Sequence, residues 1–344
     1  MCPKLEAVLY SPMSVIHKIS ICVVALLVTA AAFGQKNAPP PNAAKATCVH
    51  ATKLYVEADE SASQVATIQP GREMVIAERS GKWLRVFANT DVSIVNEQDV
   101  PVFGNQTNTP PVSGWMIDKG IVTASTPNGD EILFGAAATM EIQASEPHPP
   151  PGAALSARGL YRMVVELFPQ SQRTPEAMWR AADIRWQLQK ADAFSLPSAH
   201  EKEAYLREQI DESEMKKILK LYPHSRWAAL AAFDMIDNKI CGDWQGSEKC
   251  PEKEAGLYAK YSDEYPDSPK AAQAIYQAAW REASAGDMYQ ADNDDKKAEE
   301  ARAKAKELAG RLQSKYAQSD YAARAAGLVF MMEQKIPIYG TQEE

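Results

Sequence analysis

One short phrase recurs four times in the second half of the chain, and it constrains the fold more than any other feature. In each copy an aromatic residue stands three positions ahead of a serine. The copies are Phe168-Pro169-Gln170-Ser171, Tyr222-Pro223-His224-Ser225, Tyr265-Pro266-Asp267-Ser268 and Tyr316-Ala317-Gln318-Ser319. They lie 43 to 54 residues apart, a spacing typical of stacked supersecondary units that cannot bury their apolar faces alone.

The phrase describes the end of one helix and the start of the next. An aromatic side chain closes the first helix, proline cannot continue it, and the serine hydroxyl can accept a free backbone N–H of the second helix. Alanines after the serines would let the paired helices approach closely. These are Ala228, Ala229 and Ala231, then Ala271, Ala272 and Ala274, then Ala322, Ala323 and Ala325, while the first copy keeps only Ala177.

The sequence therefore predicts four helical hairpins within residues 153–335. The expected pairs are 155–168 with 175–189, 203–222 with 226–238, 252–265 with 269–285, and 295–316 with 320–335. The side chains expected to fill the layers between hairpins are Trp227, Phe233, Tyr276, Trp280 and Phe330. The alternative is one irregular helical domain in which the phrase recurs by chance.

This pattern resembles the divergent tetratricopeptide-like repeats of bacterial envelope proteins related to the outer-membrane assembly lipoproteins. The units are longer than the usual repeat of about 34 residues, and Ala317 stands where proline is expected. The resemblance implies an all-α solenoid of helical hairpins whose surface binds protein partners. The candidate partner-binding residues are Tyr161, Trp179, Trp186, Trp227, Tyr276 and Trp280. Packing between helices is the alternative role for these residues.

The N-terminal 34 residues have the pattern of a secretory signal peptide. His17 and Lys18 precede an apolar run from Ile19 to Phe33, and Ala32-Phe33-Gly34 supplies small residues at a cleavage site. An uncleaved anchor is the alternative. We therefore expect export to the periplasm or beyond, followed by a Pro/Ala-rich linker over residues 35–46.

Residues 47–125 show the other periodicity, with short alternating apolar runs separated by turn residues such as Pro70-Gly71 and Ser80-Gly81. Alternation with period two predicts a small antiparallel barrel. The chain is therefore expected to be multidomain, with a small all-β barrel ahead of the helical hairpins.

Two tryptophan-containing runs, Gly81-Lys82-Trp83-Leu84-Arg85-Val86 and Gly114-Trp115-Met116, resemble strands of the bacterial SH3-like domain. The chain departs from that family at Leu54-Tyr55-Val56-Glu57, where Glu57 replaces a cation, and in an extra segment near 91–111. The resemblance implies a domain that binds cell-wall peptide or glycan, or one that only docks or spaces. Tyr55, Trp83 and Trp115 are the candidate ligand-binding residues, because aromatic rings offer broad contact faces. Their alternative role is the core and rim of the barrel.

Residues 126–152 are expected to connect the two domains. Residues 130–143 have helical spacing, and the proline-rich run 146–152 is expected to end regular structure and mark a domain boundary. The C-terminal tail, 336–344, is expected to be frayed. Asp292-Asn293-Asp294-Asp295 is interpreted as a polar loop that caps the next helix.

Few residues suggest chemistry. The five histidines are scattered without metal-ligand spacing, and no nucleophile elbow or phosphate-binding glycine loop is present. We therefore predict no catalytic residue, no metal site and no cofactor. A formal charge of −8 disfavours nucleic-acid binding. In an oxidising compartment, Cys241 and Cys250 would form a disulfide, leaving Cys48 unpaired, with free thiols as the alternative.

Together these features predict a non-enzymatic cell-envelope scaffold or adaptor that binds protein partners through helical repeats. No membrane span is expected to remain after signal cleavage. The alternative is a peptidoglycan-binding accessory of a cell-wall hydrolase or remodelling complex, with the barrel as the functional part.

Overall fold

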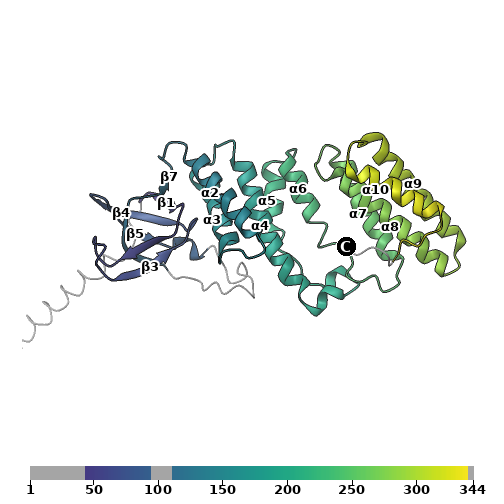
Figure 1. The fold of residues 1–344 in the computed structure, drawn as a ribbon, viewed down its shortest axis with the longest axis horizontal. Coiled ribbons are helices and arrows are strands. Elements are labelled where there is room, and N and C mark those ends of the chain that lie inside the picture. The colour runs from purple at the N-terminus through teal and green to yellow at the C-terminus, as the bar shows by residue number, and fades with distance from the viewer. Residues whose placement is uncertain (1–42, 94–110, 340–344) are drawn as a thin grey trace, which may run out of the picture.

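A computed structural model describes residues 43–93 and 111–339 of the chain. A curled antiparallel sheet forms one end of an elongated molecule, and packed helices extend from it to the other end (Figure 1). The predicted signal peptide and most of the predicted linker lie outside the described residues. Within the described residues, no helix is both long and apolar enough to cross a membrane.

The sheet has seven strands in the order β3-β2-β6-β5-β4-β1-β7, all paired antiparallel. The strands are β1 (Lys45–Cys48), β2 (Thr52–Tyr55), β3 (Gln64–Ile68), β4 (Met74–Ser80), β5 (Trp83–Ala88), β6 (Val112–Ile117) and β7 (Ile121–Thr123). A short 3-10 turn, η1 (Thr90–Ser93), follows β5. The side chains of Leu54, Leu84 and Met116 are fully buried on the inner face of the sheet. The first strand begins two residues inside the predicted linker, because Lys45 and Ala46 already pair with β4.

Helices make up the rest of the described chain. They are α2 (Gly129–Ala144), α3 (Ala153–Leu167), α4 (Thr174–Phe194), α5 (Ser213–Leu221), α6 (Arg226–Asp234), α7 (Lys249–Glu264), α8 (Ala271–Ala291), α9 (Asp295–Lys315) and α10 (Asp320–Glu333), with 3-10 turns η3 (Pro197–His200) and η4 (Ala204–Leu206) after α4. The prediction that the second half of the chain is mainly helical is confirmed. The side chain of Asp294 caps α9 by accepting the N–H of Lys297, as expected for that loop.

The recurrent phrase forms the same turn four times. Helices α3, α5, α7 and α9 each end at the aromatic residue of the phrase, whose φ lies between −127° and −133°. In every copy the aromatic N–H donates to the carbonyl four residues earlier, and the serine N–H donates back to the aromatic carbonyl. The recurrent phrase therefore ends four alternate helices in the same way.

The serines do not all act as predicted. Ser225 and Ser319 cap α6 and α10, each accepting an N–H three residues on. Ser171 and Ser268 do not cap their helices, since α4 and α8 begin three residues after these serines, following a turn. Their hydroxyls accept the N–H two residues on and also bond to Asp130 and to Tyr261 respectively.

The predicted helix over 203–222 is wrong for most of its length. Only α5 is helical, and the chain before it runs through η4 into an extended segment. The side chain of Asn238 accepts the N–H of Ile210 at 3.0 Å and donates to its carbonyl at 2.8 Å. Because this tertiary pairing uses both backbone groups of Ile210, it replaces the local helical hydrogen bonds.

The proline-rich run lies in a turn between two packed helices. Helix α2 packs along α3, with Leu133 and Phe134 against Leu160 and Tyr161 in one buried cluster. The rings of Phe134 and Tyr161 meet edge to face at 5.2 Å. Gly152, with φ of +76°, starts α3 directly after the prolines. The helical body therefore begins with α2.

Two glycines allow the sheet to touch the helices. Gly71 has a φ of +78°, and an added Cβ there would lie 2.4 Å from the backbone nitrogen of Leu160. The facing position in α3 is Gly159, where an added Cβ would lie 2.9 Å from the carbonyl oxygen of Gly71. Lys45 of β1 also forms ion pairs with Glu73 and with Glu166 of α3. Sheet and helices are therefore in direct backbone contact.

Three smaller expectations are corrected by burial. Phe330 is 59 % exposed, because no further helix of the described residues covers its side of α10, and Ala323 is exposed for the same reason. The predicted tail is not frayed at its start, since Ile338 is buried and its N–H donates to Asp287 at 2.6 Å. Residues 340–344 lie outside the described residues.

Candidate functional site

The sheet brings together the three aromatics predicted to bind a ligand. Tyr55 pairs with Trp115 across β2 and β6, and Trp115 pairs with Arg85, two residues after Trp83. Because side chains alternate along strands, all three share the face opposite the buried core. The rings of Tyr55 and Trp83 meet edge to face at 5.9 Å. Trp83 is buried, whereas Tyr55 and Trp115 are half-buried, so packing accounts for Trp83 and two ring edges remain accessible.

The aromatics predicted to bind partners separate into two groups. Tyr161, Trp186, Tyr276 and Trp280 are buried between helices, so in this structure they serve packing and are not presented to a partner. Trp179 and Trp227 are half-buried and stack on each other, with ring centroids 5.4 Å apart. The guanidinium of Arg226 lies 4.8 Å from the ring centre of Trp227. This stacked pair is the part of the prediction that remains accessible.

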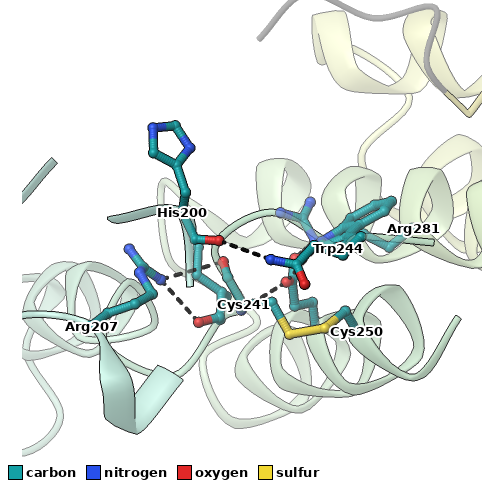
Figure 2. The surroundings of a disulfide bond; sticks show 9 residues. His200, Arg207, Cys241, Trp244, Cys250 and Arg281 are labelled. Carbon is teal, nitrogen blue, oxygen red and sulfur yellow. Dashed lines mark hydrogen bonds and ion pairs between the residues drawn. A yellow bond between two sulfur atoms is a disulfide. The ribbon is translucent and has the colours of Figure 1, made fainter. Parts of the chain in front are cut away.

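One candidate site lies where the chain passes from α6 to α7. A cavity of about 480 Å³ opens there, a size within the usual range for small-ligand sites. Its wall comes from the end of α4, η3 and η4, the loop 240–245, the helices α7 and α8, and Tyr339. The segments are distant in sequence, and Figure 2 shows the loop residues and the disulfide at their meeting point.

Two devices hold the loop in place. A disulfide joins Cys241 to Cys250, which is the pairing expected for an oxidising compartment. Glu254, only 1 % exposed, accepts hydrogen bonds from the Cys241 N–H at 2.9 Å and from the Trp244 indole at 3.1 Å. Its other oxygen accepts from the Arg281 guanidinium at 2.7 Å. The loop is thereby tied covalently and through a buried ion pair.

Arg207 forms part of the same wall and is 91 % buried, with 9 % of its surface exposed. One terminal nitrogen, Nη1, donates to the carbonyls of Ile240 and Cys241 at 3.0 and 3.3 Å. The guanidinium also lies 5.3 Å from the ring centre of Phe194. Figure 2 shows its other terminal nitrogen without a bonded neighbour among the residues drawn.

Aromatic rings line the opposite side of the cavity. Trp244 stacks on Tyr339, with ring centroids 5.9 Å apart and planes inclined by 8°, and it packs against Trp280 at 5.4 Å. The indole nitrogen of Trp280 is buried and has no hydrogen-bond partner among the described residues. The cavity therefore combines a buried cation, an unpaired donor and a flat apolar wall.

A second, smaller cavity lies between α3, α4 and α5, with a volume of about 310 Å³. Val165, Met178 and Ala181 supply apolar surface, and the charged residues Arg162, Glu166, Glu214 and Lys217 complete the lining. Arg158, buried beside it, forms an ion pair with Glu214 at 2.9 Å. An apolar floor with a charged rim suits an amphipathic peptide segment.

Cys48 is a free, buried thiol in the sheet, and desolvation raises its pKa to about 11, so it is poorly suited to nucleophilic chemistry. Across the ranges 43–93 and 111–339, no three His, Cys, Asp or Glu side chains gather closely enough to hold a metal ion. No protein-family model matches the chain, and neither does any curated protein.

Sequence reasoning missed the larger cavity almost entirely. It predicted the disulfide and singled out Trp280, but it placed Arg207 inside a helix and did not connect it to residues 240–245. The one available signal was the pair of cysteines around Gly242-Asp243-Trp244, because a short cross-linked loop that contains tryptophan is an unusual surface feature.

Proposed function

We propose that the protein is an exported, non-enzymatic scaffold of the cell envelope that binds a protein partner through its helical body. In this proposal the helical pairs are tetratricopeptide-like repeats and the sheet is an SH3-like docking domain. The observation that carries the proposal is the helix end that recurs four times with one backbone geometry at the aromatic residue. Such repetition builds long surfaces from units that contact only their neighbours, and these surfaces commonly bind peptides or helices.

The accessible features of the helical body support a protein ligand. The stacked Trp179 and Trp227 lie next to exposed Arg226, and the smaller cavity presents apolar floor and charged rim residues on α3, α4 and α5. Aromatic and arginine side chains are enriched at the centres of protein interfaces. Export rests on the basic flank, apolar run and small residues of 1–34, which implies a periplasmic or secreted location.

Site-specific photo-crosslinking in intact cells tests this function. A photoreactive residue would replace Arg226, Lys217 or, as a matched control on an exposed helical face, Lys296, which is 87 % exposed at its side chain. We expect one discrete crosslinked protein at the first two positions and none at Lys296. Equal crosslinking at all three positions, or no protein adduct at either test position, would contradict the proposal.

The second candidate function is peptidoglycan binding by the sheet, and the shared face of Tyr55, Trp83 and Trp115 is the observation that favours it. Accessible aromatic edges can stack on sugar rings. Co-sedimentation of the full chain with purified peptidoglycan, with Trp115→Ala as the test variant and Trp227→Ala as the control, separates the two functions. Loss of binding only in the Trp115 variant would favour the wall-binding function.

A further inference from the structure

The larger cavity contains a buried positive charge that the protein does not neutralise. Among the described residues, none forms an ion pair with Arg207, and its guanidinium donates hydrogen bonds to two backbone carbonyls, those of Ile240 and Cys241. Its Nε is enclosed without a partner. Its Nη2 forms no hydrogen bond with the described residues, which leaves this donor for a ligand. A buried charge is costly unless it is paired.

The other charged side chains of the lining are a buried ion pair and one exposed carboxylate with an imidazole beside it. Arg281 and Glu254 form a buried ion pair at 2.7 Å, with side chains 5 % and 2 % exposed. Asp243 contacts the imidazole of His200 at 3.1 Å, and both side chains are largely exposed, at 63 % and 71 %. Solvent screens such an exposed carboxylate. The enclosed part of the wall therefore has a net charge of one positive unit, supplied by Arg207.

We propose that this cavity is a binding site for a small organic monocarboxylate with a flat, apolar body. The ligand carboxylate would pair with the guanidinium of Arg207, and its apolar body would lie against the aromatic wall of Trp244 and Trp280. This site is separate from the protein-binding surfaces of the proposed scaffold, and its existence does not depend on that function.

Charge and wall chemistry select this ligand class. A single uncompensated guanidinium matches one negative charge, and planar carboxylates fit the planar donor fork of arginine. A phosphate dianion would require a second cation, but Arg281 is already committed to Glu254. The indole and phenol rings of the wall supply apolar surface, which favours a ligand with a flat ring over a highly hydroxylated one.

The probe is phenylacetate, and phenylacetamide is its neutral control of the same shape. We would titrate each into the full chain and follow the indole N–H resonances by NMR. We expect the Trp244 and Trp280 resonances to shift with phenylacetate at a Kd of ~1 mM, while the other five tryptophans stay unchanged. Phenylacetamide should bind at least about tenfold more weakly, since it cannot form the ion pair.

The matched variants are Arg207→Gln, Arg207→Lys and, as control, Arg324→Gln, which removes an arginine that also lies over an aromatic ring. Arg207→Gln should weaken phenylacetate binding by about tenfold or more, Arg207→Lys should keep part of the affinity, and Arg324→Gln should leave it unchanged. Far-UV circular dichroism checks that each variant is folded. If Arg207→Gln unfolds, the proposal is tested by the affinity of the Arg207→Lys variant for phenylacetate and by the affinity of the unchanged chain for phenylacetamide.

Several results would overturn the proposal. These are equal binding of acid and amide, unchanged affinity in a folded Arg207→Gln variant, no indole shift at ~20 mM phenylacetate, or displacement of phenylacetate by an equal concentration of inorganic phosphate. The last test measures phenylacetate binding by a chain shortened to end at Tyr339. If phenylacetate binds only that shortened chain, an acidic residue of the chain itself occupies the cavity, and the free-ligand site is refuted.

Discussion

Asp234, the last residue of α6, makes the fold sensitive to alkaline pH. Its Oδ2 is buried without a hydrogen-bond partner. Burial, and then the nearby carboxylates of Asp183 and Asp237, raise the pKa of Asp234 from 3.8 to about 8. Burial likewise raises the pKa of Asp183. Asp234 is therefore a carboxyl group that the folded chain keeps protonated near neutral pH.

The sign of the effect on stability follows from linkage. Between pH 4 and pH 8 the unfolded chain releases this proton while the folded chain retains it, so the free energy of unfolding falls as the pH rises. The interval from 3.8 to about 8 corresponds to about 6 kcal/mol as an upper limit. We expect about 2 kcal/mol to be measured, because water reaches part of the carboxyl group and neighbouring side chains relax.

The perturbation is Asp234→Asn, which keeps the shape and removes the ionisation. Urea unfolding of the full chain at pH 5, 7 and 9, followed by circular dichroism, should show the variant gaining stability over the natural sequence as the pH rises. The gain should reach about 2 kcal/mol at pH 9. Parallel pH profiles for the two chains, or a variant less stable at pH 9, would refute the reasoning.

Asp237, three residues away, is the matched control with the opposite expectation. Its carboxylate accepts from the Lys190 ammonium at 2.8 Å and from the buried Trp186 indole at 3.3 Å. Asp237→Asn weakens both bonds and should destabilise the chain by about 1–2 kcal/mol. Both substitutions replace a carboxyl group with an amide at neighbouring positions, so a general effect of that replacement would move both variants in the same direction.

Three further predictions test the contact between sheet and helices, the buried ion pair and the cap of the last helix. Gly71→Ala should lower the free energy of unfolding in urea by over about 2 kcal/mol, because the added Cβ would clash with the backbone of α3. Gly81→Ala is the control: this glycine also has a positive φ but faces open space, and the loss should be only about 1 kcal/mol. Equal losses at the two positions would contradict the close approach. Glu254→Gln should cost about 3–5 kcal/mol by leaving buried Arg281 without its carboxylate, and a cost below about 1 kcal/mol would mean that solvent reaches the pair. Ser319→Ala should lower the free energy of unfolding by about 1 kcal/mol, and an unchanged value would exclude a stabilising cap.

The local features of the chain were predictable where short-range chemistry decides them. The phrase that ends in Ser319 stops one helix and caps the next in the structure, because the aromatic, the turn and the hydroxyl act within a few residues. The alternation around Trp83 and Trp115 predicted strands, and these strands form with their aromatics on one face.

Predictions failed where distant residues supply the bonds. Asn238 holds Ile210 extended, so the helical pattern before α5 is overridden by a side chain 28 residues away. The proline run before Gly152 marked a break in regular structure, but not the packing of α2 on α3 across it. Burial of Trp186 likewise depends on helices that no local pattern identifies.

The sequence by itself determined where helices stop, where strands alternate and which two cysteines could pair, because each of these depends on neighbours along the chain. Only the tertiary structure decided that Arg207 lies buried without a carboxylate beside a wall of indoles. The physical reason is that burial and charge pairing depend on which distant segments meet, and four separate stretches of chain meet at this cavity.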